Sequence, residues 1–360
     1  MIPQSAFRNP KYEDMIGFAR EALGLSESVS LKLSPLEGRG SDRTFFRLIW
    51  NRKNSAILVH YDPKRVENTY YADIAVFLHE IDVPVPRLIR HDPAGCLIIM
   101  EDLGDTDLWS FRKTDWESRR ALYQKTLAIV HRLHSFPNDD FPSGRVRLME
   151  GFGPDLYRWE RDYFKDHFVR DVCGIKLGPS FERELEEELS SLADRLTGTV
   201  RCLVHRDLQS QNVMIRDGEP FLIDFQGMRF GSPFYDLGSL LCDPYVHLST
   251  SLEINPEPHG EGVIFSGSER EELLSFYYGM AKWDLDWVTF QNHFWEASAQ
   301  RLMQALGAYG FLGLNKGLKA FLEHTPTGLQ NLQYAASHVA NLPRLRELSV
   351  TCQRAVEKKV

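Results

Sequence analysis

Apolar residues alternate with polar ones in the first third of the chain and recur every three or four positions in most of the remainder. Alternation predicts strands, whereas a period near 3.6 predicts helices with one buried face. The predicted strands are Leu31–Trp50, interrupted by a turn, Ala56–Val59 and Cys96–Met100. The predicted helices are Lys11–Leu23, Asn68–Glu80, Trp116–Leu133, Leu156–Val169, Phe181–Leu196, Asp236–Leu241 and most of Glu269–Val360. Stretches rich in Pro and Gly, 137–153 and 254–267, are predicted to be loops.

A further pair of strands is predicted within the helical part. The apolar runs Asn212–Ile215 and Phe221–Ile223 flank a turn at Asp217-Gly218, a pattern typical of a β-hairpin. The triplet His205-Arg206-Asp207 precedes the hairpin, and the second run leads into Asp224. We therefore expect an acid, an amide and a second acid together at the mouth of the hairpin, namely Asp207, Asn212 and Asp224.

These three side chains suit phosphoryl transfer, which needs positioning and charge neutralisation rather than covalent chemistry from the protein. A carboxylate has to orient the attacking hydroxyl and accept its proton, and Asp207 is predicted to do so. Mg²⁺ prefers oxygen ligands, and Asn212 and Asp224 supply them. The sequence thus predicts a catalytic and metal site made of Asp207, Asn212 and Asp224.

The spacing His-Arg-Asp-x-x-x-x-Asn, followed by an Asp at a strand end, is the signature of the protein-kinase-like fold. Phe225-Gln226 stands where protein kinases have Phe-Gly, and the heptapeptide Gly231–Leu237 follows. In these features the chain resembles the aminoglycoside phosphotransferase and choline kinase branch, from about Leu31 to about Leu332. The resemblance implies that Asp236 braces the catalytic loop, a role compatible with capping the helix that follows.

The resemblance also implies an α+β fold of two lobes. Residues 1–103 would form a small nucleotide-binding lobe built on an antiparallel sheet. Residues 104–360 would form a larger, mainly helical lobe that carries the catalytic hairpin and binds the substrate. ATP and Mg²⁺ are the expected cofactors.

The turn at 36–43 contains two glycines with small polar neighbours, which lets backbone amides approach phosphates. It is not a complete G-x-G-x-x-G motif, because Arg43 stands where the last glycine would be. An ordinary hairpin turn is the alternative interpretation. Its place before the strand Thr44–Leu48 favours nucleotide contact by Gly40, Ser41, Asp42 and Arg43.

The lysine that holds phosphates in kinases has no counterpart at the expected position. His60 ends the strand that would carry it, and Tyr71 stands where its glutamate partner would be. A neutral imidazole is a poor substitute for a lysine. We therefore predict that Arg43 or Arg47 contacts the phosphates instead. The alternative is that both arginines face solvent from their strand.

The segment Cys96–Gly104 resembles the hinge between kinase lobes. It is an apolar strand that ends in Glu-Asp-Leu-Gly. Adenine would stack between apolar side chains here and bond to the backbone around Glu101 and Leu103.

Three features resemble the bacterial cell-wall amino-sugar kinases, which phosphorylate N-acetylmuramate or N-acetylglucosamine. They are the segment Ser41–Arg47 without a following phosphate lysine, the sequence Glu101–Gly104, and the Gln300-Arg301 helix followed by Leu318–Leu322. A sugar is therefore the favoured acceptor. A sugar carboxylate would need a cation, and Arg158 and Arg301 are the candidates, with Trp159 on the same aromatic helix as Arg158. That helix also has an alternative interpretation as an amphipathic core helix.

Composition and charge disfavour several other classes of function. The 360 residues carry a net charge of −8 with acids and bases intermixed, which disfavours a nucleic-acid binder. The five cysteines are scattered, and no apolar run reaches transmembrane length. The N-terminus lacks a signal-peptide pattern, so a cytoplasmic protein without a membrane partner is expected. Whether it is a monomer or a dimer stays open.

Other interpretations remain at this point. The alternative acceptor is another small alcohol, of the aminoglycoside, choline or homoserine type. A protein kinase is disfavoured, because no Ala-Pro-Glu follows Asp224 and the segment to Asp236 is short. A nucleotide-binding pseudokinase is the remaining alternative, suggested by the missing lysine.

Overall fold

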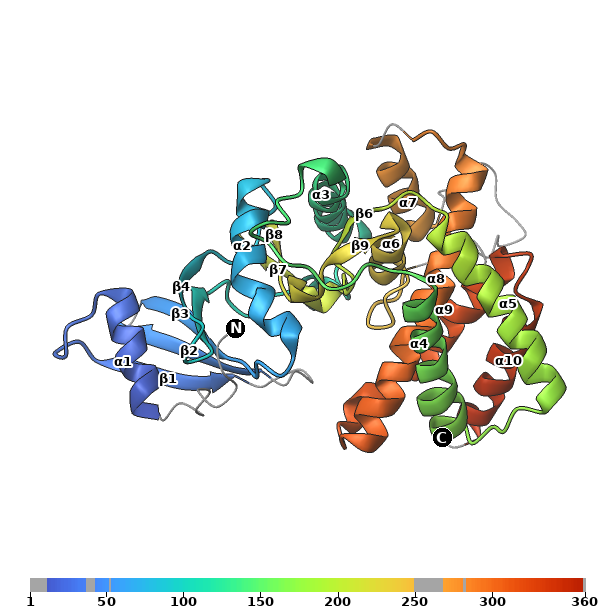
Figure 1. The fold of residues 1–360 in the computed structure, drawn as a ribbon, viewed down its shortest axis with the longest axis horizontal. Coiled ribbons are helices and arrows are strands. Elements are labelled where there is room, and N and C mark those ends of the chain that lie inside the picture. The colour runs from blue at the N-terminus through green and yellow to red at the C-terminus, as the bar shows by residue number, and fades with distance from the viewer. Residues whose placement is uncertain (1–11, 37–42, 52, 249–267, 281–282, 359–360) are drawn as a thin grey trace.

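The computed structural model describes residues 12–36, 43–51, 53–248, 268–280 and 283–358. The predicted nucleotide contacts Gly40, Ser41 and Asp42 lie outside these residues, as does the predicted loop 254–267. Within the described residues, an antiparallel sheet comes first and a mainly helical part follows, as predicted (Figure 1).

The N-terminal sheet has the strand order β1-β2-β3-β5-β4, and every neighbouring pair is antiparallel. Its strands are β1 (Leu31–Leu36), β2 (Thr44–Trp50), β3 (Asn54–His60), β4 (Leu88–Asp92) and β5 (Leu97–Glu101). The helices of this part are α1 (Tyr12–Leu23) and α2 (Tyr71–Glu80). The helix predicted from Asn68 begins as a 3₁₀ turn, Val66–Tyr70, and becomes α-helical at Tyr71.

The two faces of this sheet belong to different cores, because alternate residues of a strand point to opposite sides. Leu58 and Ile99 pack with Met15 and Ala19 of α1 in a small cluster. Ile57 and Ile98 belong to the main cluster, which continues through α2 into the helical part. The inner face of the sheet is thereby tied to the rest of the molecule, and the lobe boundary at residue 103 stays a prediction.

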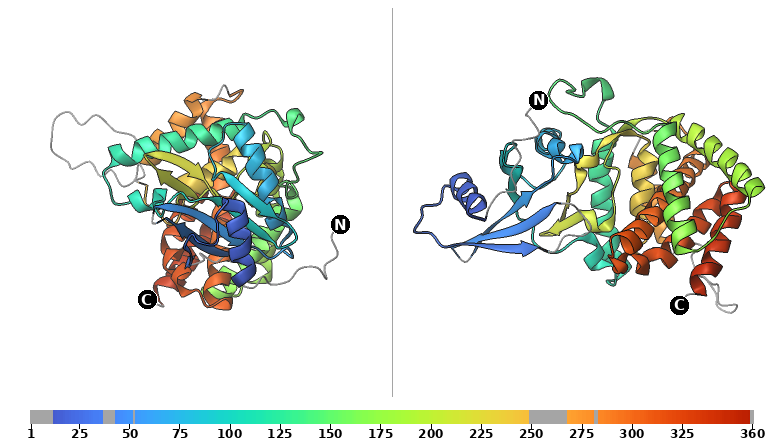
Figure 2. Two further views of the ribbon diagram at one scale, coloured as in Figure 1. Left: turned by 90° about the vertical axis from the view of Figure 1, so that its left-hand side faces the viewer. Right: turned by 60° about the horizontal axis from the view of Figure 1, so that its bottom comes forward.

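The helical part is organised around α8, which packs against α4, α6 and α9 (Figures 1 and 2). Its helices are α3 (Trp116–His134), α4 (Pro154–Phe164), α5 (Pro179–Thr197), α6 (Pro233–Leu241), α7 (Glu269–Met280), α8 (Trp287–Gly310), α9 (Thr325–His338) and α10 (Pro343–Glu357). Asp115 and Asp286 cap α3 and α8 by accepting backbone N–H bonds. α4 and α8 continue into π-helical turns at Lys165–Val172 and Phe311–Asn315.

Two short antiparallel pairs lie between the sheet and the helices. β7 (Val213–Arg216) and β8 (Glu219–Leu222) form the predicted hairpin, and β6 (Cys202–Val204) pairs with β9 (Arg229–Gly231). Asp217 and Gly218 both have positive φ, as a tight two-residue hairpin turn requires. Further 3₁₀ turns are Leu108–Phe111, Asn138–Asp140, Ser210–Asn212, Phe225–Gly227 and Lys319–His324.

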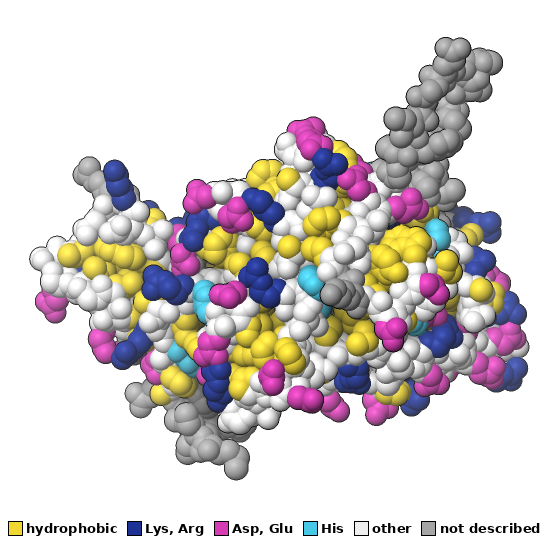
Figure 3. Space-filling view, turned by 90° about the horizontal axis from the view of Figure 1, so that it is seen from above, with side chains coloured by type: hydrophobic (Ala, Val, Ile, Leu, Met, Phe, Trp, Pro, Cys, Tyr) yellow, Lys and Arg dark blue, Asp and Glu magenta, His cyan; other side chains and the backbone are white. Residues whose placement is uncertain are grey.

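Figure 3 shows acidic and basic side chains intermixed over one face, without a large patch of one sign. Among the described helices, none is both long and apolar enough to cross a bilayer.

Candidate active site

The catalytic loop is fixed by one buried carboxylate at the start of α6. Asp236 accepts hydrogen bonds from the backbone N–H groups of His205, at 2.7 Å, and Arg206, at 2.8 Å. Its Oδ2 also lies 3.0 Å from His134 Nε2. Asp236 therefore braces the loop, as the resemblance implied. Arg206 has a φ of 77°, so the loop turns sharply just before Asp207.

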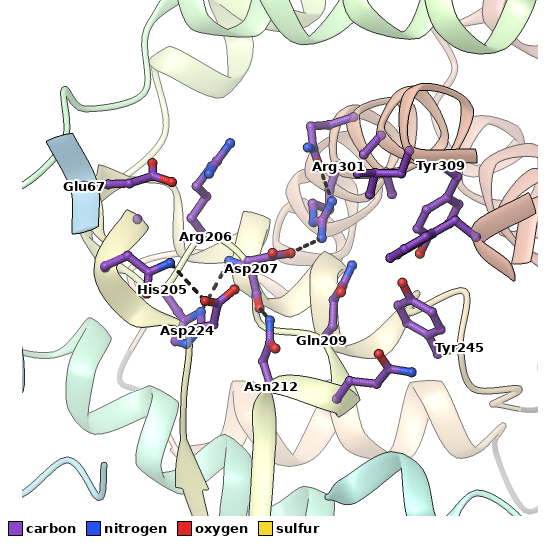
Figure 4. A pocket seen from close by; sticks show the side chains of 18 of the residues that line it. Glu67, His205, Arg206, Asp207, Gln209, Asn212, Asp224, Tyr245, Arg301 and Tyr309 are labelled. Atoms are coloured by element: carbon purple, nitrogen blue, oxygen red, sulfur yellow. Dashed lines mark hydrogen bonds and ion pairs between the residues drawn. The ribbon is translucent and has the colours of Figure 1, made fainter. Parts of the chain in front are cut away.

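The structure brings Asp207, Asn212 and Asp224 together (Figure 4). All three line one cavity of about 240 Å³. Asn212 Nδ2 donates to the backbone oxygen of Asp207 at 2.8 Å, which joins the hairpin to the catalytic loop. Asp224 has a φ of 65°, so the chain turns immediately after β8 and this carboxylate faces the cavity. The predicted grouping of acid, amide and acid is present.

Asp207 is oriented by an arginine from α8. Arg301 Nη2 donates to Asp207 Oδ1 at 2.5 Å, and its side chain is only 4% exposed. Burial acts to lower the pKa of Arg301, but the charge of Asp207 raises it further, so the guanidinium stays protonated. Asp207 Oδ2 makes no hydrogen bond to any described residue, so this oxygen remains available to an acceptor hydroxyl.

The oxygen atoms of Asn212 and Asp224 fit a hard divalent cation. Asn212 uses its Nδ2 to bind Asp207, while its Oδ1 has no hydrogen bond within the described part of the chain. Asp224 Oδ1 accepts from Arg43 and from Gln226 Nε2, at 2.9 Å for the latter, and Oδ2 makes no bond to a described residue. Burial opposes ionisation of Asp224, but the positive charge of Arg43 lowers its pKa overall. The donor set therefore matches Mg²⁺, with one anionic and one amide oxygen.

A second cavity, also of about 240 Å³, adjoins the first on the side of the sheet. It is lined mainly by apolar side chains from both parts of the molecule, namely Leu36, Phe45, Ile57, Tyr71, Pro86, Met100, Leu103, Met214 and Ile223. The residues that line both cavities are Arg43, Gln211, Asn212 and Asp224. An apolar slot therefore opens into a polar cavity at the two predicted metal ligands.

Arg43 and Arg47 both line the apolar cavity, but they have different partners. Arg43 contacts Asp224 and donates to Gln226 Oε1 at 2.9 Å, so it reaches the wall between the cavities. Arg47 pairs with two other carboxylates of the apolar cavity: its Nε lies 2.7 Å from Asp102 Oδ2, and its Nη2 lies 2.8 Å from Asp105 Oδ1. Both arginines are paired with carboxylates at the cavity wall. This argues against the alternative interpretation of both as solvent-facing strand residues.

The predicted hinge residues line the apolar cavity as well. Leu103 is buried, and the Glu101 side chain accepts from Arg216 Nη1 at 2.7 Å. That ion pair connects the last strand of the sheet to the hairpin strand β7. The backbone between Glu101 and Leu103 thus borders the apolar cavity.

The positions of the usual Lys–Glu pair are occupied differently, as expected from the sequence. His60 lines neither cavity, and burial lowers the pKa of its imidazole, so it contributes no charge there. Tyr71 stacks on Phe225 with a centroid separation of 4.6 Å and donates its hydroxyl to Met100 Sδ at 2.9 Å. An aromatic contact therefore joins α2 to the segment after Asp224.

The structure does not place Arg158 or Trp159 at the acceptor site. Both lie on the exposed face of α4, and neither lines the cavity that contains Asp207. The helical period turns Tyr157 and Glu160 inward instead, and Glu160 accepts from Tyr235 Oη at 2.8 Å and from Gln300 Nε2 at 3.0 Å. The interpretation as an amphipathic core helix is the one that fits.

The model of the phosphotransferase enzyme family matches residues 32–265, which is more than half of the chain. The chain belongs to this family. The matched region contains the N-terminal sheet that lines the apolar cavity, the catalytic loop and the β7–β8 hairpin. Membership supports a small-molecule kinase rather than a protein kinase.

Curated proteins with similar sequences are named N-acetylmuramate/N-acetylglucosamine kinase or methylthioribose kinase. The N-acetylmuramate/N-acetylglucosamine kinase of Neisseria meningitidis serogroup B is 20% identical, with 86% of each chain covered. The enzyme of that name from Pseudomonas aeruginosa is 23% identical, with 93% of each chain covered. The methylthioribose kinase of Pectobacterium atrosepticum is 22% identical, with 66% of each chain covered.

Solved structures of phosphotransferases show the same fold. The gentamicin complex of APH(2")-IIa superposes with a TM-score of 0.56 at 14% identity, covering 90% of this chain and 97% of the other. A choline/ethanolamine kinase family protein from Mesorhizobium loti gives 0.55 at 16% identity, covering 94% and 99%. The predicted protein-kinase-like fold is thereby confirmed.

Several residues of this phosphotransferase site were not predicted from the sequence. They line the cavity beside Asp207 and include Glu67, Arg206, Gln209, Tyr245, Gln304 and Tyr309. Arg206 lies next to the catalytic acid in the sequence, and Gln304 follows Arg301 by three positions on α8, so spacing alone was a usable signal for both. Tyr245 and Tyr309 carried no local signal, since they meet only through the packing of α8 beside the segment after α6.

Proposed function

We propose that the chain transfers the γ-phosphoryl group of ATP to a hydroxyl of an amino sugar, with Mg²⁺ as cofactor. The observation that carries this proposal is the wall shared by the two cavities. A nucleotide in the apolar slot would extend its phosphates toward Asn212 and Asp224, whereas Asp207 lines only the polar cavity. Donor and acceptor would thus meet at this wall, which is the geometry that phosphoryl transfer needs.

Asp207 acts as the base in this proposal. Arg301 holds Oδ1, which leaves Oδ2 to take the hydroxyl proton as the acceptor oxygen attacks the γ-phosphorus. The bond between that phosphorus and the bridging oxygen breaks, and ADP leaves with this oxygen. Asp236 fixes the backbone of His205 and Arg206 and thereby limits the movement of the loop. Positioning of this kind accounts for most of the catalysis in phosphoryl transfer.

Asn212 and Asp224 would hold Mg²⁺, which neutralises phosphate charge when bound. Arg43 contributes a further positive charge at the same wall. Its contact with Asp224 places the guanidinium where the phosphates would arrive, which supports Arg43 over Arg47 as the replacement for the missing lysine. Arg47 is already held by Asp102 and Asp105.

The acceptor cavity favours an anionic sugar. Arg65, Arg206 and Arg301 line it, together with Glu67 and the catalytic Asp207. Arg301 is neutralised by Asp207, but the Arg206 guanidinium makes no hydrogen bond or ion pair with a described residue. A guanidinium so placed can bind a carboxylate through two parallel hydrogen bonds. N-acetylmuramate carries such a carboxylate, and relatives with that substrate in their names support this choice.

The same charges argue against cationic acceptors. An aminoglycoside or choline would bring positive charge to a cavity wall rich in arginine. Methylthioribose is neutral, and relatives named for it keep it as the second candidate. Bound methylthioribose would leave the Arg206 guanidinium without an anionic partner.

A kinase assay across N-acetylmuramate, N-acetylglucosamine, methylthioribose, choline and an aminoglycoside tests the proposal. Coupled ADP release measures turnover, and phosphorus NMR identifies the esterified hydroxyl. We expect N-acetylmuramate to give the highest kcat/KM, with N-acetylglucosamine next. Preferred turnover of choline or an aminoglycoside would contradict the acceptor class, and preferred turnover of methylthioribose would contradict the role of Arg206. Asp207→Asn serves as the inactive control.

A further inference from the structure

Gln226 stands where protein kinases have the glycine of their Asp-Phe-Gly motif. The residue is only 6% exposed, yet it lines the polar cavity beside Asp224. A buried amide has a donor and an acceptor that both need partners. The partners of Gln226 therefore indicate what this amide does at the site.

The Gln226 amide joins two side chains of opposite charge. Its Nε2 donates to Asp224 Oδ1 at 2.9 Å, and its Oε1 accepts from Arg43 Nη1 at 2.9 Å. Arg43 also contacts Asp224 directly. Because a guanidinium only donates and a carboxylate only accepts, a neutral amide can bond to both at once. Arg43, Gln226 and Asp224 thus form a closed cluster, the Gln226 cluster.

The backbone that carries Gln226 is held firmly. Phe225–Gly227 is a 3₁₀ turn, closed by a hydrogen bond of 3.0 Å from Met228 N–H to the Phe225 oxygen. Phe225 is fully buried and stacks on Tyr71 of α2. Arg43, in contrast, reaches the cluster through a long side chain from the segment just before β2. Gln226 is therefore the fixed member that can hold the flexible guanidinium in place.

Gln226 and Asp224 differ in how they hold Arg43. In the proposed function Asp224 binds Mg²⁺, and a cation at this carboxylate competes with Arg43 for its negative charge. Gln226 is neutral, so the bond from Arg43 to its Oε1 is not subject to that competition. The bond from Gln226 Nε2 to Oδ1 leaves Asp224 Oδ2, which makes no bond to a described residue, open to the cation.

We propose that Gln226 is a positioning residue that keeps the Arg43 guanidinium at the phosphates and orients Asp224 when the metal site is filled. This inference rests on the proposed function, in which Arg43 meets the phosphates and Asp224 holds Mg²⁺. Gln226 would do for Arg43 what the glutamate partner does for the phosphate lysine of protein kinases. A glutamate at position 226 would repel Asp224, and a glycine would hold neither side chain.

Substitution of Gln226 tests the inference without an acceptor sugar. Gln226→Met keeps the length of the side chain and removes both hydrogen bonds, and Gln226→Ala is a second variant in case the first folds poorly. Gln330→Met, on the exposed side of α9, is the matched control. Calorimetry measures the affinities for Mg-ATP, metal-free ATP and adenosine. The same titrations on Arg43→Met and on the double variant Arg43→Met/Gln226→Met complete a double-mutant cycle.

We expect Gln226→Met to weaken Mg-ATP binding by about 10-fold, with a smaller loss for metal-free ATP and none for adenosine. The double variant should lose less affinity for Mg-ATP than the product of the two single losses, because Gln226 acts partly through Arg43. A side chain that only supported the fold would weaken all three ligands alike and give independent losses.

Wild-type affinity for Mg-ATP in both Gln226 variants, alongside a weakened Arg43→Met, would overturn this inference and leave the proposed function standing. Independent losses in the cycle would also overturn it. Wild-type affinity in Arg43→Met would overturn the proposed contact of Arg43 with phosphate, and the role of Gln226 with it.

Discussion

Arg301 Nη2 lies 2.5 Å from Asp207 Oδ1, so the long helix α8 is joined to the catalytic loop by one charged pair. The arginine is buried, whereas the carboxylate is 40% exposed to the acceptor cavity. This asymmetry fixes one oxygen of the base and leaves the other accessible. The pair thus explains how a residue nearly a hundred positions away in the sequence shapes the catalytic centre.

Asp207→Asn should lower kcat by roughly 10²–10⁴-fold, because the amide keeps the size of the side chain but cannot accept the hydroxyl proton. ATP affinity should persist, since Asp207 does not line the apolar slot. Steady-state turnover and nucleotide titration separate the two effects. Asp217→Asn, in the exposed hairpin turn, is the matched control. A near-normal kcat in Asp207→Asn would remove the residue from the role of base.

Asp224→Ala should abolish turnover and weaken binding of Mg-ATP far more than binding of metal-free ATP. The reason is that Asp224 offers the anionic oxygen of the proposed metal pair, with Asn212 as its neutral partner. Calorimetric titrations with and without Mg²⁺ compare the two affinities directly. Equal affinity for Mg-ATP before and after the change would show that the metal is held elsewhere.

Arg43→Met should weaken ATP binding and slow transfer more than Arg47→Met does. Both changes keep much of the aliphatic stem and remove the charge. Arg43 reaches the wall between the cavities, whereas Arg47 is paired with Asp102 and Asp105 away from it. Nucleotide affinity and single-turnover rates measure the difference. If neither variant differs from the wild type, arginine has not replaced the phosphate lysine.

Arg206→Met should raise KM for N-acetylmuramate by about 10- to 100-fold, since a charged hydrogen-bonding interaction contributes about 1.5–3 kcal/mol. KM for N-acetylglucosamine, which lacks the carboxylate, should change little. Arg158→Met, on the exposed face of α4, is the control and should leave both values near those of the wild type. An unchanged ratio of the two KM values in Arg206→Met would exclude this residue from recognition of the carboxylate.

Asp243 should make stability depend on pH. It is buried and accepts N–H bonds from Ser210 at 2.8 Å and Tyr245 at 3.0 Å, yet burial raises its pKa to about 6. In the unfolded chain the pKa of this carboxyl is lower, about 3.9. As pH rises, the unfolded chain therefore loses the proton before the folded protein does. The free energy of unfolding consequently falls between about pH 4 and pH 6 through this group. Urea unfolding at pH 5 and pH 7 of wild type and Asp243→Asn isolates the effect. The pH dependence should be smaller in Asp243→Asn, and an equal dependence in both proteins would contradict the assignment.

The hairpin and its three polar residues could be predicted because the information is local. Asp207, Asn212 and Asp224 lie within 18 positions of one another, and turn residues and alternation fix their relative placement. The antiparallel sheet and most helices followed from periodicity in the same way. Boundaries were less accurate, as at Tyr71, where a 3₁₀ turn precedes the α-helix.

The acceptor side of the site depends on long-range packing and was predicted less well. Arg158 and Trp159 were chosen for their chemistry, but the period of α4 turns Glu160 toward α8 and leaves them outside. Arg301 was chosen on equally slight grounds and does line the cavity, because α8 passes beside the catalytic loop. The predicted contacts of Gly40, Ser41 and Asp42 with nucleotide stay predictions.

The outer face of the N-terminal sheet has its own small core with α1, separate from the core that unites the inner face with the helices. Regions with separate cores can open separately, at a lower free energy than global unfolding. Limited proteolysis of the native protein should therefore first remove the segment that contains α1. The catalytic hairpin would remain protected, since β3 and β5 stay anchored through Ile57 and Ile98 on the other face.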